Sequence, residues 1–235
     1  RFYRASESEG DAVLAGDHVT TSEGDLVVHP INHASFVMQW NGKMIYNDPV
    51  GGAALYRDLP KADLILVSHQ HGDHFNSATL NAVKDDDTVI ITGAAVFGQM
   101  SSSLKGITTT LANGETMEAI GLTIEAVPSY NSRHPKDRDN GYVLTIGGKR
   151  IYMSGDTEDT SEMRALENID VAFISMNLPF TMSIDQAADA VREFRPRVVY
   201  PYHFRNQDGS FSNLEAFKKL VGRDGVVEVR IRDWY

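Results

Sequence analysis

The stretch that decides the chemistry is Ser68-His69-Gln70-His71-Gly72-Asp73-His74, which directly follows the apolar run Leu64-Ile65-Leu66-Val67. Imidazole and carboxylate groups are ordinary ligands of Zn²⁺ and other divalent metals. A solvent-exposed polar loop is the alternative interpretation. It is disfavoured because four ligand-type side chains crowd the end of a buried strand, where the functional sites of α/β sheets gather. The stretch therefore predicts a metal site.

The spacing within this stretch predicts how its donors are shared. His69 and His71 are two residues apart, so in an extended segment they face the same way. We expect Gly72 to permit a tight turn, after which Asp73 and His74 can face a second ion. Four donors can thus serve two neighbouring ions.

Working outward, short apolar runs without alternation predict strands that are covered on both faces. They lie at residues 64–67, 89–91, 171–174 and 198–200. Hairpins are predicted at Asn41-Gly42 and Gly147-Gly148, because both central residues of a type I′ turn need positive φ. An amphipathic helix is predicted over residues 183–194, which opens with a Ser183/Gln186 capping box. Further helices are predicted over residues 213–221, 160–166 and 95–100. Sheets enclosed by helices, an α/β architecture, follow from this mixture.

No composition break or linker divides the chain. We interpret residues 1–24 as an N-terminal arm or edge element and residues 25–235 as a single domain. The chain begins at Arg1 rather than Met, which suits a trimmed chain or one whose leader was removed. A cytoplasmic and a periplasmic location both stay open.

Composition excludes several classes of protein. The 235 residues contain no cysteine, so neither a disulfide framework nor a thiolate metal site is expected. No run approaches the roughly 18 apolar residues of a membrane span. The net charge of −10 argues against nucleic acid as the main partner. We expect a small-molecule substrate instead, and leave open whether the chain forms a homo-oligomer.

The His-x-His-x-Asp-His pattern after an apolar strand resembles the metallo-β-lactamase superfamily of metallohydrolases. The resemblance runs from about residue 25 to about residue 204. Its other motifs are Asn32-His33-Ala34-Ser35, Asn47-Asp48-Pro49, Ser154-Gly155-Asp156-Thr157 and Tyr200-Pro201-Tyr202-His203-Phe204. Their order is similar to that of the L-ascorbate-6-phosphate lactonase-like branch. The resemblance implies an αββα sandwich of two mixed β-sheets flanked by helices.

The resemblance also implies the ligand set. His69 and His71 match ligands of one metal, and Asp73 and His74 match ligands of the other. Asp156 matches a carboxylate that bridges both ions, and His203 matches the last histidine ligand. The remaining ligand is matched by His134, in a segment from Tyr130 to Asp139 that the sequence predicts to be a long polar loop. The implied cofactors are two divalent ions, Zn²⁺ first, with Mn²⁺ or Fe²⁺ as alternatives.

Several residues are expected to act beside the ligands. His33 matches a histidine that this branch keeps near the metals, and we expect it to contact substrate or to donate a proton. Asp48 can fix the tautomer of a ligand histidine, and Thr157 is expected to support the site in the same way. Arg133 and Arg205 can hold a phosphate or carboxylate of the substrate, although the sequence slightly favours the alternative that they are solubility charges. Phe180 can pack against an apolar group of the substrate, and Tyr130 is expected in the same binding region.

The function implied is a metal-dependent hydrolase in which a metal-bridged hydroxide cleaves a lactone, ester or phosphodiester bond, with Asp73 orienting the nucleophile. A β-lactam hydrolase or a nuclease of the same superfamily is the alternative. A flavodiiron-type oxidoreductase is disfavoured because that kind places Glu where this chain has His71. A non-catalytic metal-binding protein is the remaining alternative from another class.

Overall fold

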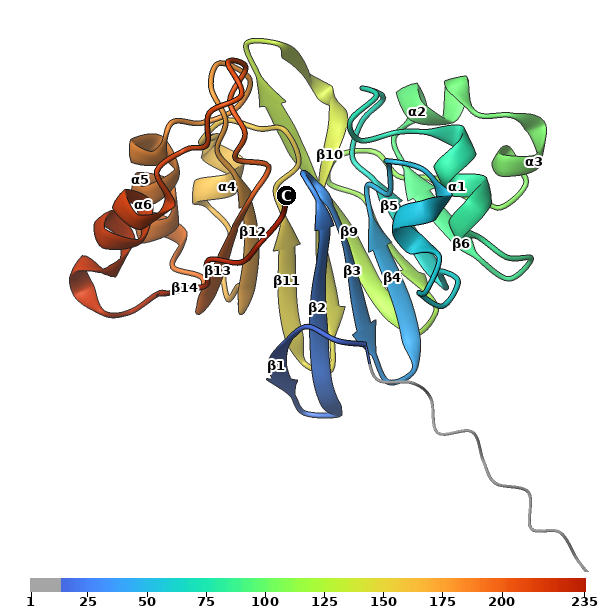
Figure 1. The fold of residues 1–235 in the computed structure, drawn as a ribbon, viewed down its shortest axis with the longest axis horizontal. Coiled ribbons are helices and arrows are strands. Elements are labelled where there is room, and N and C mark those ends of the chain that lie inside the picture. The colour runs from blue at the N-terminus through green and yellow to red at the C-terminus, as the bar shows by residue number, and fades with distance from the viewer. Residues whose placement is uncertain (1–13) are drawn as a thin grey trace, which may run out of the picture.

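Two seven-stranded sheets pack face to face, and each is built from one half of the chain. This computed structural model describes residues 14–235. Helices cover the outer face of each sheet, as the edge-on view in Figure 1 shows. The predicted order of layers, helix, sheet, sheet, helix, is confirmed.

The first sheet has the strand order β1 to β7. Its members are β1 (Asp17–Thr21), β2 (Gly24–Asn32), β3 (Ser35–Trp40), β4 (Lys43–Asn47), β5 (Leu64–Val67), β6 (Val89–Thr92) and β7 (Thr108–Thr110). Neighbours from β1 to β4 are antiparallel, and neighbours from β4 to β7 are parallel. The sheet is therefore mixed, and β5, at the centre of its parallel part, is buried along its whole length.

The second sheet repeats this plan. Its members are β8 (Thr116–Ala119), β9 (Leu122–Asn131), β10 (His134–Ile146), β11 (Lys149–Met153), β12 (Val171–Ser175), β13 (Val198–Tyr202) and β14 (Glu228–Val229). Neighbours from β8 to β11 are antiparallel, and neighbours from β11 to β14 are parallel. Each half of the chain thus places its parallel strands in the same part of its sheet.

The helices lie on opposite outer faces of the sandwich (Figure 1). On one side are α1 (Ser77–Val83), α2 (Ala94–Gln99) and α3 (Ser102–Lys105), and on the other are α4 (Ser161–Arg164), α5 (Ile184–Phe194) and α6 (Leu214–Val221). Short 3₁₀ turns are η1 (Ala53–Tyr56) and η2 (Gly222–Asp224). No helix among residues 14–235 is long and apolar enough to cross a membrane.

Aromatic side chains join the two sheets in the core. Phe36 of β3 stacks on Phe173 of β12 with ring centroids 4.2 Å apart, and Phe173 stacks in turn on Tyr200. Trp234 meets Phe36 edge-on, with centroids 5.6 Å apart. Aromatic pairs of this kind contribute about 0.5–1.5 kcal/mol beyond their buried area. These aromatic contacts hold the inner faces of the two sheets together.

The predicted turns and caps are confirmed. Asn41 and Gly42 have φ of 49° and 73°, and Gly147 and Gly148 have φ of 51° and 75°, as type I′ hairpins require. The Ser183/Gln186 capping box opens α5. The helices predicted at residues 213–221, 160–166 and 95–100 are present as α6, α4 and α2, the last two with shifted bounds.

Two expectations were wrong. Residues 130–139 are not a long loop, because β9 and β10 continue as a hairpin that pairs Asn131 with His134. A register shift between His134 and Asp139 breaks the alternation that would have revealed the strand. A glycine is not needed at position 72 for this turn, since the φ of Gly72 is not positive and a Cβ there would meet no atom within 4 Å.

Of the predicted N-terminal element, residues 1–13 lie outside the described part, and residues 17–21 form edge strand β1.

Candidate metal centre

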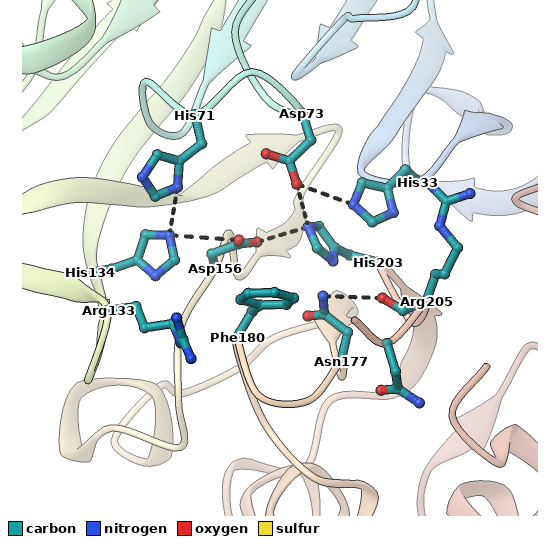
Figure 2. A pocket seen from close by; sticks show the side chains of 11 residues that line it. His33, His71, Asp73, Arg133, His134, Asp156, Asn177, Phe180, His203 and Arg205 are labelled. Carbon is teal, nitrogen blue, oxygen red and sulfur yellow. Dashed lines mark hydrogen bonds and ion pairs between the residues drawn. The ribbon is translucent and has the colours of Figure 1, made fainter. Parts of the chain in front are cut away.

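The candidate site lies where β5, β11 and β13 end at one edge of the sandwich. β5 leads into His69, β11 leads into Asp156, and β13 leads into His203. The β9–β10 hairpin adds His134 from the side. Figure 2 shows His134, Asp156 and His203 pointing toward one another. Segments that are far apart in the sequence therefore supply one cluster of donors.

Three histidines form the first group of donors. The Nε2 atoms of His69 and His134 each lie 3.1 Å from Nδ1 of His71. All three donor atoms lie within 4.8 Å of one another. Imidazole nitrogens gathered so closely are suited to share one divalent cation.

A second group forms around His74 and His203. Their Nε2 atoms are 3.0 Å apart, and Asp73 Oδ2 lies 3.7 Å from His74 Nε2 and 3.5 Å from His203 Nε2. Asp73 has 47% of its side chain exposed, whereas both histidines are buried. The carboxylate of Asp73 therefore faces the open side of this group.

Asp156 lies between the two groups. Its Oδ2 is 3.8 Å from His69 Nε2 and 3.7 Å from His134 Nε2. Its Oδ1 is 3.2 Å from His74 Nε2 and 3.3 Å from His203 Nε2. This Oδ1 atom is buried and accepts no hydrogen bond, and an orphaned carboxylate oxygen among imidazoles is the environment that a cation satisfies. The residues present thus fit bound divalent metal.

The electrostatics of the clustered side chains are consistent with metal binding. Burial and the nearby His74 hold the pKa of His69 well below its usual value, so His69 is neutral and able to ligate. Burial acts to raise the pKa of Asp156, but the charges of His203 and His74 lower it well below the usual value. Burial acts to lower the pKa of His74, but the carboxylates of Asp156 and Asp48 raise it well above the usual value.

Asp48 hydrogen-bonds Nδ1 of His74, the ring nitrogen that does not face the cluster. Its Oδ2 accepts a hydrogen bond from His74 Nδ1 at 2.7 Å, and both side chains are fully buried. Ser68 N and Ser68 Oγ donate to the same carboxylate, each at 2.7 Å. This fixes the tautomer that turns Nε2 of His74 toward the cluster.

Asn131 does the same for His134, and sequence reasoning missed it. Asn131 Oδ1 lies 3.0 Å from His134 Nδ1, and Asn131 Nδ2 donates to the backbone oxygen of Asp156 at 3.0 Å. Thr157 Oγ1 lies farther out and bonds the backbone of Tyr130. The pairing of Asn131 with His134 across the hairpin was hidden by reading this segment as a loop.

A pocket of about 530 Å³ opens over the cluster. Arg133, Phe180 and Arg205, three of the four residues predicted to bind substrate, line it together with His33. Asn177 and Asn206 also line it, and no sequence motif indicated them.

Tyr130 corrects the prediction. Its hydroxyl donates to Glu162 at 2.8 Å and its ring lies beneath Lys136, outside the pocket. Successive residues of a strand point to opposite faces, so Asn131 faces the cluster and Tyr130 faces away. Lys136 and Arg138, in the same segment, are paired with Glu162 and Asp139.

Residues 28–203 match the family model of the beta-lactamase superfamily domain. The chain belongs to this superfamily. It is 30% identical over 211 residues to the UPF0173 metal-dependent hydrolase of Pyrococcus abyssi, a match that covers 85% of this chain and 93% of the relative. The chain is accordingly a metal-dependent hydrolase of the metallo-β-lactamase superfamily, in the UPF0173 family.

Several solved structures of other proteins have the same fold as this chain. A Parabacteroides distasonis protein provisionally named a metal-dependent hydrolase is 39% identical with a TM-score of 0.83, covering 95% of this chain and all of that chain. Igni18, a metallo hydrolase from Ignicoccus hospitalis, is 25% identical with a TM-score of 0.76, covering 88% of this chain and 95% of that one. CmlA, a diiron β-hydroxylase from Streptomyces venezuelae, shares the fold at 16% identity and a TM-score of 0.70, with 87% of this chain and 52% of that chain covered.

Proposed function

We propose that this hydrolase holds two divalent ions, Zn²⁺ first, and cleaves a lactone, ester or phosphodiester bond of a small anionic substrate. His69, His71 and His134 would hold one ion, and Asp73, His74 and His203 would hold the other. The position of Asp156 carries the proposal, because its two oxygens face different histidine groups.

Bound divalent ions would lower the pKa of a coordinated water and offset negative charge that develops on the substrate. Asp73, exposed toward the pocket, would then orient the attacking water. His33 lines the pocket, with Nε2 3.2 Å from Asp73 Oδ2, and is placed to contact substrate.

Two arginines support an anionic substrate. Among residues 14–235, neither Arg133 nor Arg205 forms an ion pair, and both line the pocket with exposed guanidinium groups. Arg133 lies over the ring of Phe180 at 5.2 Å, and Arg205 lies over Tyr235 at 4.9 Å. Stacking holds each guanidinium while leaving its N–H donors free for a phosphate or carboxylate. Phe180 also offers an apolar wall.

The experiment combines elemental analysis with a chromogenic panel of esters, lactones, bis(4-nitrophenyl) phosphate and nitrocefin, run with and without chelator. We expect turnover of an ester, lactone or phosphodiester that chelation abolishes. The variants His69→Ala and Asp73→Asn should lose activity by at least about 100-fold. His18→Ala is the matched control, since the His18 side chain is exposed and hydrogen-bonds the exposed side chain of Asp25. Full turnover by His69→Ala in metal-replete protein would overturn the proposal.

A further inference from the structure

The segment 230–235, which follows β14, crosses back to the site and ends beside β2 at the point marked C in Figure 1. Trp234 anchors it, because this side chain is almost fully buried and packs on Phe36. The backbone oxygen of Trp234 accepts the N–H of His33 at 3.1 Å. The next residue, Tyr235, therefore lies directly against His33.

Tyr235 makes contacts on two sides of the pocket. Its hydroxyl lies 2.7 Å from His33 Nδ1 and accepts the N–H of Arg205 at 3.2 Å. Its ring lies under the Arg205 guanidinium and stacks on Phe211, with ring centroids 5.0 Å apart. One side chain thus contacts both a catalytic candidate and an anion-binding candidate.

The hydrogen bonds of His33 define its tautomer. Asp73 is ionised and can only accept, so His33 Nε2, at 3.2 Å from Asp73 Oδ2, carries a proton. In the neutral ring Nδ1 is then the acceptor, and Tyr235 supplies the proton of that bond. The order of donation is Tyr235 O–H to His33 Nδ1, and His33 Nε2–H to Asp73 Oδ2.

We propose that Tyr235 is a positioning residue that, together with Asp73, fixes the Nε2–H tautomer of His33, so that His33 holds the carboxylate of Asp73 instead of binding metal. The competing arrangement is ligation, since donor atoms of His33, Asp73 and His203 lie within 4.8 Å of one another. Against it, the ring of His33 lies over the ring of His203, with centroids 3.7 Å apart and planes 40° apart. Both nitrogens of His33 instead have hydrogen-bond partners, Asp73 Oδ2 at 3.2 Å and the Tyr235 hydroxyl at 2.7 Å.

The decisive test is a long-range ¹H–¹⁵N correlation spectrum of the zinc-loaded protein at about pH 8. It separates protonated, unprotonated and metal-bound imidazole nitrogens, and His33→Gln assigns the His33 signals. We expect a protonated Nε2 and an unprotonated Nδ1, and a mixture of tautomers in Tyr235→Phe. A metal-bound Nε2, an Nδ1–H tautomer, or an unchanged spectrum in Tyr235→Phe would overturn the proposal.

Tyr46→Phe is the matched control for that spectrum, because the Tyr46 hydroxyl donates to the Pro60 backbone oxygen and neither residue lines the pocket. It should leave the His33 tautomer unchanged. The spectrum does not depend on turnover, so it stands or fails separately from the proposed hydrolysis.

The kinetic consequence rests on the proposed function and uses the substrate that the chromogenic panel identifies. Tyr235→Phe keeps the ring beneath Arg205 and should lower kcat by about 10-fold or more while KM changes little. Tyr235→Leu also removes the ring and should raise KM as well. Equal effects of both variants on KM alone would contradict a positioning role through His33.

Discussion

Three of the ligand-type histidines, His69, His74 and His134, are oriented by the partner of their second nitrogen. His74 is held by Asp48, His134 by Asn131, and His69 Nδ1 lies 3.0 Å from Ser68 Oγ. A hydrogen bond at one nitrogen fixes which nitrogen can ligate. The geometry of the cluster is therefore set as much by these supporting groups as by the donors.

Asp48→Asn tests this support at the level of one residue. An amide can donate as well as accept, so it cannot receive all of the bonds that Ser68 and His74 direct to Asp48. Asn tolerates the left-handed φ of 43° found here, so the backbone stays unstrained. We expect zinc affinity to fall about 10- to 100-fold in a competition titration with a chromogenic chelator.

Asp63→Asn is the control for Asp48→Asn, since Asp63 accepts the N–H of Met44 away from the cluster. It should leave zinc affinity unchanged. Equal zinc affinity in Asp48→Asn and the wild-type protein would show that Asp48 does not orient His74.

Zinc binding should release a proton from His74. The carboxylates of Asp156 and Asp48 raise the pKa of His74 above its usual value against the effect of burial, so the metal-free side chain is protonated at neutral pH. Zinc and the proton compete for Nε2, and affinity should therefore rise by up to about tenfold per pH unit until the raised pKa is reached. Calorimetry in two buffers of different ionisation enthalpy measures the released proton. An absence of proton release would contradict the raised pKa.

At the scale of the elements, the conformation of the turn after β11 determines where the Asp156 side chain points. Gly155 has φ of 63°, and a Cβ there would lie 2.9 Å from Ser129 Oγ and 3.1 Å from the oxygen of Asn140. The Gly155 N–H also bonds the Tyr202 hydroxyl at 3.0 Å. The Asp156 carboxylate is thus placed by a backbone conformation that suits glycine.

Gly155→Ala should therefore lower the free energy of unfolding by about 1–2 kcal/mol for the left-handed backbone alone, and weaken zinc binding by displacing Asp156. Gly72→Ala is the paired control, because it lies in the histidine-rich stretch but meets no neighbouring atom. Chemical denaturation and zinc titration of both variants measure the difference. Equal effects of the two substitutions would contradict the distinction drawn between these glycines.

At the scale of the whole molecule, the two halves share one topology and meet at the metal centre. The fourth strand of each sheet, β4 and β11, is followed by an aspartate, Asp48 in one half and Asp156 in the other. The first half supplies the donors from His69 to His74, and the second half supplies His134, Asp156 and His203. Bound metal should therefore hold the halves together.

Chelation should lower the thermal unfolding temperature. Metal that binds the folded state alone stabilises it by about 2.7 kcal/mol at a free concentration 100 times its Kd. Circular dichroism melts of chelated, zinc-loaded and zinc-restored protein measure the shift, which readdition of zinc should reverse. Equal unfolding temperatures would show that the cluster binds no metal tightly.

The sequence was a good guide to the elements and to the side chains that gather in the cluster. The strand runs, hairpin turns and capping box are local patterns, since they depend on side-chain periodicity and backbone preferences over a few residues. Local pattern failed where the β9–β10 hairpin carries polar residues and a register shift, so the burial of His134 and the outward direction of Tyr130 were missed.

The sequence by itself determined the chemistry of this protein, because ligand type and spacing beside a buried strand are written into one short stretch. Only the tertiary structure decided which groups hold these side chains in position. His33 and Tyr235 are 202 residues apart yet share a hydrogen bond, and Asn131 reaches both His134 and Asp156. Such contacts depend on how two sheets pack, and packing brings together residues that no local pattern relates.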